Sequence, residues 1–565
     1  MSLFSTLQIA NNALSAQQLG LQVTGNNVAN ANTPGYIRER LTLAPATANR
    51  IGGLLIGLGV DVQGVVLQTD RFLEERLRIS SADVANTEAQ STTYSELESL
   101  LGELSDNDLS TSLTRFFGSV NDVLNQPENL SVRNLAIQQG ATLSTDIRRL
   151  DKRVRDVRSD LDGRISGAVS RVNGLLRKIA DLNLKIVSFE GGGTSKSDAV
   201  GLRDERSQTA NELTRLIGCS TIEQPDGALA VFARGDYLVS NGTIRKIGIR
   251  YDYDRGMARA NLEFVDTQAP IAIDSGELAG QITGRDAILG GALDQLGNIT
   301  SELIHEFNKV HASGQGLTGY SDLTGEFPVS NTTVPLDQAD LPFPPENGTF
   351  QLLMYNKQTK QSTSTNINVR LNGMEDDNSL VDVAAALDAI DGLSAEVTPD
   401  RKLRIRSESS NFSFGFANDT SGILASLGIN TFFSGSTSSN IAINANLRND
   451  PTKFAASSTG FGKDSKNAEV LAALLDSPLP HLTGESIASI YENFISETAQ
   501  AAANTKAANQ GFAAFNATLE SQMLSISGVN LDEEAVRMIA YQRAYQAAAR
   551  MIKAVDDLLG TLVNL

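Results

Sequence analysis

The sequence predicts an α+β multidomain protein whose N-terminal and C-terminal helices pair as a coiled coil. The first observation is a charge-free opening: Asp, Glu, Lys and Arg make up 20% of the chain, yet none occurs from Met1 to Ile37. The second is a heptad of apolar residues in each terminal segment, and the third is a long interior stretch of helical periodicity. A helix without a charged face is expected to contact protein on most sides.

The two terminal segments carry matching apolar stripes. Near the N-terminus a residue of this stripe recurs at every seventh position, which places it on one face of a helix: Leu7, Leu14, Leu21 and Val28. The C-terminal stripe consists of Ala535, Met538, Tyr545, Ala549, Ile552, Val555, Leu559 and Leu562. Asn530 and Glu533 form a predicted capping pair for this last helix. Two such helices predict a subunit that polymerises through its paired ends.

Each terminal helix adjoins a longer motif. The first is NNVANANTPGY, from Asn26 to Tyr36, in which the Thr-Pro-Gly sequence ends the helix. The second is SGVNLDEEAVRMIAYQRAYQAAARMI, from Ser527 to Ile552. Together they resemble the two signatures of the flagellar rod, hook and hook-associated axial proteins. This resemblance implies that the turn is set by Asn30, Thr33, Pro34, Gly35 and Tyr36, and that self-assembly uses the N-terminal stripe with Met538, Tyr545, Ile552, Leu559 and Leu562.

Interior segments alternate between strands and helices. Short strands are expected after Tyr36, and helix returns near Thr69 and again over Leu109 to Asn125. The clearest helical pattern predicts a helix from Thr142 to Ser188, about 70 Å long at 1.5 Å per residue. Its arginines alternate with aspartates at pairing distance, which indicates a solvated helix face rather than an anion site.

Two later segments narrow the resemblance. A helix is predicted from Ser197 to Ile217, a β meander from Ser220 to Asp266, and a helix from Gly276 to Ala312. The first of these helices contains LRDER, and the last ends in FNKVHASGQGLTG. Both segments resemble the hook-associated protein 1 family in particular.

A β-rich insertion is predicted from Thr349 to Phe433. The proline-rich stretch from Pro335 to Pro345 is interpreted as its linker, and Ser434 to Asn440 as a flexible exit. The expected domains are an N-terminal axial segment, a long-helix domain with a meander, a projecting insertion, a return segment and a C-terminal axial helix: 1–66, 67–340, 341–440, 441–526 and 527–565.

Composition excludes several classes of function. The 47 basic and 66 acidic residues give a net charge of -19, which argues against nucleic acid and anionic membranes as partners. Apolar runs are too short for membrane insertion. The N-terminus shows neither the basic nor the apolar region of a cleaved signal peptide. The single cysteine, Cys219, is expected to be a small buried apolar residue.

The sequence offers no catalytic, cofactor-binding or metal-binding residue. His305 begins an H-E-x-x-H-like stretch, but Lys309 stands where the second histidine is required. The G-x-G-x-x-G letters from Gly314 to Gly319 follow a helix instead of a strand. We therefore expect a protein without cofactor or enzymatic activity.

The leading hypothesis is a structural subunit of the bacterial flagellum at the junction between hook and filament. The resemblance implies a homo-oligomer in a ring or short helical layer, with hook protein and hook-associated protein 3 as neighbours. It also implies type III export, a cytoplasmic export chaperone at the C-terminal helix, and an extracellular location. The alternatives are another axial component (hook or distal rod protein), or a secreted adhesin or enzyme displayed on axial termini. The long charged helix from Thr142 to Ser188 argues against a hook protein.

Overall fold

The computed structural model describes residues 3–33, 35–51, 54–102, 108–191, 199–479 and 484–563. The chain forms two compact units. Unit 1 contains Met1–Thr93, Asp160–Asp286 and Ala503–Leu565, and unit 2 contains Tyr94–Ser159 and Ala287–Ala502. The divisions fall inside long helices instead of in linkers. The boundaries of the five domains expected from the sequence stay predictions.

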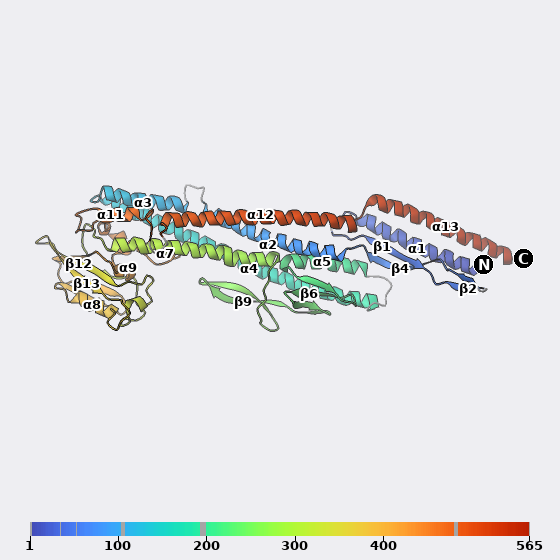
Figure 1. Cartoon of the computed structure of the whole chain (residues 1–565), viewed down its shortest axis with the longest axis horizontal. Coiled ribbons are helices and arrows are strands. Elements are labelled where there is room, and N and C mark those ends of the chain that lie inside the picture. Colours follow the sequence, from blue (N-terminus) through green and yellow to red (C-terminus); the bar gives the residue numbers. More distant parts are fainter. Residues whose placement is uncertain are drawn as a thin grey trace. The chain divides into compact units, whose positions relative to one another are not determined.

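The chain ends lie together in unit 1. Helix α1 (Leu3–Asn30) packs along α13 (Leu531–Val563), and Figure 1 shows the two helices side by side. Strands β1 (Glu39–Pro45) and β4 (Val60–Leu67) form an antiparallel pair that also contacts α1. A second short pair joins β2 (Asn49–Ile51) and β3 (Leu54–Ile56). The predicted α+β fold with paired terminal helices is confirmed.

Long helices cross from one unit to the other. They are α2 (Arg71–Leu101), α4 (Leu130–Glu190) and α12 (Ile487–Ser527). Helix α4 begins at Leu130, so it is longer than the helix predicted from Thr142 to Ser188. The reason is a cap: the Asn129 side chain accepts a hydrogen bond from the Ser131 backbone N–H at 2.9 Å.

The rest of unit 1 is a helix-and-sheet core. Helices α5 (Val200–Ile217) and α6 (Gly276–Thr283) and a π-helix (Gly284–Leu289) accompany a β meander. Its four-stranded sheet has the order β5-β6-β7-β8 (Ser220–Glu223, Leu229–Ala233, Asp236–Ser240, Thr243–Ile244). A separate hairpin joins β9 (Ile247–Asp254) to β10 (Met257–Phe264). Buried residues of α4, α5 and both sheets share one apolar core.

Unit 2 combines helices with small sheets. Helices α3 (Leu109–Asn125), α7 (Gly290–Ala312) and α11 (Lys466–Ala473) contact one another beside an aromatic cluster. One sheet has the order β13-β12-β16 (Gln361–Val369, Gly348–Asn356, Phe412–Ala417), and another β11-β15-β14 (Asp322–Thr324, Leu403–Ser407, Leu393–Val397). The smaller elements are α8 (Leu380–Asp388), a 3-10 turn (Leu336–Gln338), α9 (Ile423–Ser426), β17 (Phe433–Ser434), β18 (Ala442–Ile443), α10 (Ala445–Asn449) and a second 3-10 turn (Pro451–Lys453).

Both segments interpreted as linkers are packed, so these two predictions are wrong. In the proline-rich stretch, Leu336 and Ala339 are fully buried in the core of unit 2. In the Ser/Gly tract, Ser438 is buried and its hydroxyl donates to Asp151 Oδ1 at 2.7 Å. Composition does not distinguish these cases, because polar and proline-rich segments can also pack when their side chains and backbone form specific contacts.

Candidate functional site

The seam between α1 and α13 is built from small residues of α1. A Cβ atom added at Gly20 would lie 2.7 Å from the Tyr541 ring, so only glycine permits this approach. One heptad further along, Asn27 Nδ2 donates to Glu534 Oε2 at 3.1 Å. Asn27 comes seven residues after Gly20, and Glu534 seven before Tyr541, so both contacts fit one antiparallel register. The same register places Ala13 opposite the buried Ala548.

The leucine heptad therefore does not form this seam. The seam runs through Ala13, Gly20 and Asn27, one residue before the predicted stripe, which is a rotation of about 100° around the helix. The predicted residues of α1 are half-buried (Leu7, Leu14, Leu21) or, for Val28, 37% exposed. On α13 the predicted residues Met538, Tyr545, Ile552 and Leu559 are half-buried. Their use in self-assembly stays a prediction.

The turn after α1 is only partly described. Asn30 Nδ2 donates to the Asn26 carbonyl at 3.1 Å, Thr33 Oγ1 donates to Asn30 Oδ1 at 3.3 Å, and Gly35 has a φ of 80°. This φ lies in the left-handed region that glycine tolerates. Pro34 and the side chain of Leu562 lie outside the described residues. Asn30 and Thr33 thus form local hydrogen bonds in the turn, and the role of the five predicted residues in setting it stays a prediction.

A buried ion pair joins the two ends of the chain. The Arg38 side chain is 7% exposed and that of Glu534 is 1% exposed. Arg38 Nε donates to Glu534 Oε1 at 2.9 Å, and its Nη2 also reaches Glu533 Oε2 at 2.9 Å. Burial opposes the charge on Arg38, but the hydrogen bonds to both glutamates outweigh it and raise its pKa above the usual value. Removing one partner of such a pair leaves an uncompensated buried charge.

Asn27 connects this ion pair to the turn. Besides Glu534, its Nδ2 donates to the Glu39 carbonyl at 3.0 Å, and its Oδ1 accepts from the Glu39 N–H at 2.9 Å. The same Oδ1 accepts from the Tyr36 hydroxyl at 2.9 Å. Burial, with the carboxylates of Glu39, Asp204 and Glu534, raises the pKa of Tyr36 well above its usual value. The N-terminal and C-terminal motifs therefore share one hydrogen-bonded centre.

Backbone contacts continue this joint to the end of α12. The Arg38 N–H donates to the Ser527 carbonyl at 3.0 Å, and Gln68 Nε2 donates to the Ile526 carbonyl at 3.1 Å. Asn530 Oδ1 accepts from the Asp532 N–H at 2.9 Å and caps α13, as predicted. Glu533 instead turns towards Arg38, so the predicted reciprocal cap is half right.

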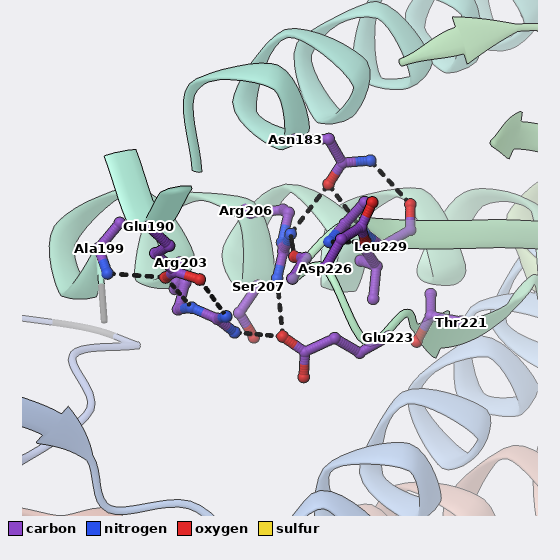
Figure 2. Close-up of polar contacts among 12 residues, drawn as sticks. Asn183, Glu190, Ala199, Arg203, Arg206, Ser207, Thr221, Glu223, Asp226 and Leu229 are labelled. Carbon is purple, nitrogen blue, oxygen red and sulfur yellow. Dashed lines mark hydrogen bonds and ion pairs between the residues drawn. The ribbon is translucent and has the colours of Figure 1, made fainter. Parts of the chain in front are cut away.

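The LRDER segment forms a second polar cluster in unit 1. Figure 2 shows Arg203 of α5 between Glu190 and Glu223. Its Nε and Nη2 donate to the two Glu190 oxygens at 2.7 and 2.8 Å. Arg206 donates to Asn183 Oδ1 at 2.9 Å, and Asn183 pairs with both backbone groups of Leu229. These bonds fasten α5 to α4 and to the meander, which is a structural role.

Asp204 of the same segment points towards the turn. Gln208 Nε2 donates to its Oδ2 at 3.0 Å, whereas Oδ1 is buried without a hydrogen-bond partner among the described residues. Burial and, secondly, the Glu39 carboxylate raise the pKa of Asp204 to about 6. Unit 1 thus holds a carboxyl group whose ionisation is unfavourable in the folded state.

The FNKVHASGQGLTG segment completes a polar centre in unit 2. Asn308 Oδ1 accepts from the N–H groups of Phe432 and Phe433, both at 2.9 Å. His311 Nδ1–H donates to the Asn430 carbonyl at 2.8 Å, and its Nε2 accepts from the Ala455 N–H at 3.0 Å. Burial lowers the pKa of His311 to about 4, so the imidazole is neutral at pH 7. The segment therefore organises a core.

Sequence reasoning missed the residues that close the seam: Gly20, Asn27, Arg38, Glu534 and Tyr541. One signal was available, because Arg38 is the first charge after 37 neutral positions and directly follows the turn. In the sequence, Glu534 is one of three successive acidic residues at the start of the last helix. Its partner lies 496 positions away in sequence, and no local pattern reports such a distance.

Across the described residues, no group of three or more His, Cys, Asp or Glu side chains is placed to hold a metal ion. Among the described helices, none combines the length and apolarity needed to cross a membrane. Cys219 is buried as expected, and burial raises the pKa of its thiol to about 11.

Comparison with protein families covers both ends and the middle of the chain. Residues 94–327 match the helical domain of the flagellar hook-associated protein FlgK. Residues 7–36 match the flagella basal body rod protein family, and residues 520–565 match the C-terminal region of the flagellar basal body rod FlgEFG proteins. The terminal matches contain Asn27 and Glu534, which meet in the structure.

Individual relatives extend over the whole chain. The flagellar hook-associated protein 1 of Salmonella typhimurium (strain LT2) is 25% identical over 582 residues, covering 99% of this chain and 100% of that protein. The protein of the same name from Bacillus subtilis (strain 168) is 25% identical over 574 residues, covering 100% and 98%. The solved structure of the flagellar hook junction protein FlgK from Burkholderia pseudomallei shares the fold, with a TM-score of 0.50, 15% identity, and 80% and 100% coverage. Along its whole length the chain is therefore similar to the flagellar hook-associated protein 1 family.

Proposed function

We propose that this chain is a structural subunit of the bacterial flagellum at the junction between hook and filament, and that it enters the tube through its paired terminal helices. The observation that carries this proposal is the joint between the two ends. One buried ion pair and one asparagine fix α1 against α13. The pair is therefore held in one register before any neighbour is added.

The outer surfaces of the pair suit contact with further copies. Val536, Met551 and Leu558 are exposed on α13. With Ala540, Ala547 and Ala554 they fall on one stripe, about 110° from the seam at 100° per residue. On α1 the half-buried leucine heptad flanks the seam, and no charged residue interrupts it. Monomeric proteins rarely expose extended apolar surface, so these stripes mark a contact surface.

The proposed neighbours rest on similarity to flagellar axial proteins. We propose a ring or short helical layer of identical copies, with hook protein on one side and hook-associated protein 3 on the other. Before assembly, the exposed stripe of α13 would be covered by a cytoplasmic export chaperone. The chain would then leave the cell by type III export and reside in the extracellular flagellum, without enzymatic activity.

The test separates assembly from folding. Leu558→Asp places a carboxylate on a side chain that is 56% exposed, so the melting of the soluble protein should not change. In the tube the same carboxylate would be buried without a partner, which costs several kcal/mol. We expect secreted, folded protein and cells with hooks but without attached filaments. Gln546→Asp, on an exposed polar part of α13, is the matched control. Normal filaments with Leu558→Asp contradict the proposed contact.

A further inference from the structure

Unit 1 carries a hairpin that extends an apolar face beyond its core. In the β9–β10 register, Ile247 pairs with Phe264 and Ile249 with Leu262, and Ile247, Phe264 and Leu262 are buried. On the same face, Tyr251 pairs with Ala260 and Tyr253 with Ala258. Their side chains are 61% and 86% exposed. We call Tyr251 and Tyr253 the tyrosine arm.

The arm is held rigidly at its base and along its other face. Arg285, buried at 1% exposure, donates to the Ala260 carbonyl at 2.6 Å and to Asp162 Oδ1 at 2.7 Å. On the opposite face, Arg259 donates to both oxygens of Asp252 at 3.0 and 2.8 Å. A preorganised surface loses little conformational entropy on binding, and tyrosine is among the side chains that dominate interfaces.

A complementary patch lies elsewhere on unit 1. The Arg76 guanidinium lies 5.7 Å from the centre of the Phe72 ring on α2 and 5.8 Å from that of Phe515 on α12. Phe72 and Phe515 are exposed, as are Ile79 and Phe512 beside them. Arg76 has no carboxylate within ion-pairing distance among the residues that the structure describes. We call these five residues the arginine–aromatic patch.

We propose that the tyrosine arm of one copy docks on the arginine–aromatic patch of the next copy, forming a head-to-tail contact around the junction layer. This inference rests on the proposed function, because it requires neighbouring copies. The chemistry is complementary: the exposed rings beside Arg76 offer apolar surface to a further aromatic side chain, and the tyrosine hydroxyl accepts a hydrogen bond from the guanidinium. The carboxylates of Asp252 and Asp254, next to the tyrosine arm, are already paired with arginines of the same hairpin, so docking buries no uncompensated acid.

The placement of the two surfaces fits a repeating contact. Within unit 1, Figure 1 shows β9 along one edge and α12 along the opposite edge. A contact between different surfaces of identical subunits generates a ring or a helix, whereas one surface meeting itself stops at a dimer. Two tyrosines bury only about 150–250 Å² each, too little for a stable dimer in dilute solution. The terminal helices would hold the copies together and make this contact effectively intramolecular.

Disulfide trapping in isolated flagella tests the contact. The full chain carries Tyr253→Cys together with Phe72→Cys, and mild oxidation is followed by non-reducing electrophoresis. We expect a ladder of dimers, trimers and larger species, because each copy donates one thiol to each neighbour. Either single variant should remain monomeric. So should the pair Tyr253→Cys with Met374→Cys, whose second site is exposed in unit 2. The buried Cys219 keeps the background low.

A second measurement covers the case in which a cysteine variant assembles poorly. Arg76→Glu is expected to reduce incorporation into flagella several-fold with unchanged melting, and Tyr253→Arg in the same chain should restore it. Incorporation without a ladder, together with no rescue, overturns the tyrosine-arm contact. The presence of the wild-type chain in isolated flagella, measured by immunoblot, tests the proposed function separately. Its absence there refutes both.

Discussion

Each unit buries a polar centre inside an apolar structure, but the side chains that form the two centres differ in charge. Unit 1 buries a charged pair, Arg38 and Glu534, where the two ends of the chain meet. Unit 2 buries the neutral imidazole of His311, which bonds to backbone groups as the amide of Asn308 does, near the buried Arg133. A charged pair is strongly destabilising when one partner is removed, and it fixes register. A neutral buried histidine destabilises the folded state only when the pH is low enough to protonate it.

The largest expected effect breaks the charged centre. Glu534→Ala leaves Arg38 buried without its main partner, which should cost about 3–5 kcal/mol locally. Hydrogen exchange followed by mass spectrometry should show lost protection in α1 and α13, with unit 2 unchanged. Glu533→Ala is the control, because that side chain is 56% exposed, and it should cost less than about 1 kcal/mol. Equal effects of the two variants would show that the seam does not depend on the buried pair.

The second prediction addresses the neutral centre through pH. Because the folded pKa of His311 is about 4 and an unfolded histidine titrates near 6.5, the unfolded state gains a proton first as pH falls. The stability of unit 2 should be full above about pH 6.5 and decrease by about 3 kcal/mol towards pH 4. Hydrogen exchange of unit 2 during denaturant titrations at several pH values measures this loss of unfolding free energy. His311→Gln should flatten the profile, and a measured His311 pKa near 6.5 contradicts the prediction.

The third prediction tests the close approach on α1. Gly20→Ala puts a methyl group against the Tyr541 ring, and we expect a loss of about 1–3 kcal/mol as the helices separate or the ring moves. Gly25→Ala is matched, since its added methyl would have open space within 4 Å. It should stabilise α1 by up to about 1 kcal/mol through helix propensity. If both variants stabilise the protein, the seam is looser than the Gly20 contact indicates.

The smallest expected effect contrasts the two units once more. Asp204 has a folded pKa of about 6 against an unfolded value near 3.9. The folded state therefore holds the proton more tightly than the unfolded state. The stability that unit 1 gains from protonated Asp204 is fully present below about pH 4 and is lost as pH rises through 6. After allowance for partial exposure, Asp204→Asn should stabilise unit 1 by about 1 kcal/mol at pH 7.5 and by nothing at pH 4. Melting temperatures at both values measure this. A stabilisation independent of pH would assign the effect to something other than ionisation.

Sequence periodicity predicted most helices because each depends on neighbours three and four residues away. The helix from Leu109 to Asn125 matches α3 at both ends. Prediction was poorer where polar segments pack against distant residues, as Ser438 does against Asp151. The candidate site was predicted in part: the terminal helices and the Asn530 cap were found, but the residues that join the ends were not.

From the sequence alone it follows that both termini are helices, that the N-terminal helix carries no charged residue, and that the ends must meet to cover apolar stripes. The face that α1 uses was decided by tertiary structure. Two heptads one residue apart, through Gly20 and through Leu21, are equally compatible with an isolated helix. The Gly20 face packs against α13 because the Tyr541 ring requires a position without a side chain, and because Asn27 on the same face bonds to Glu534. That choice depends on residues about five hundred positions away, and so only the folded chain can make it.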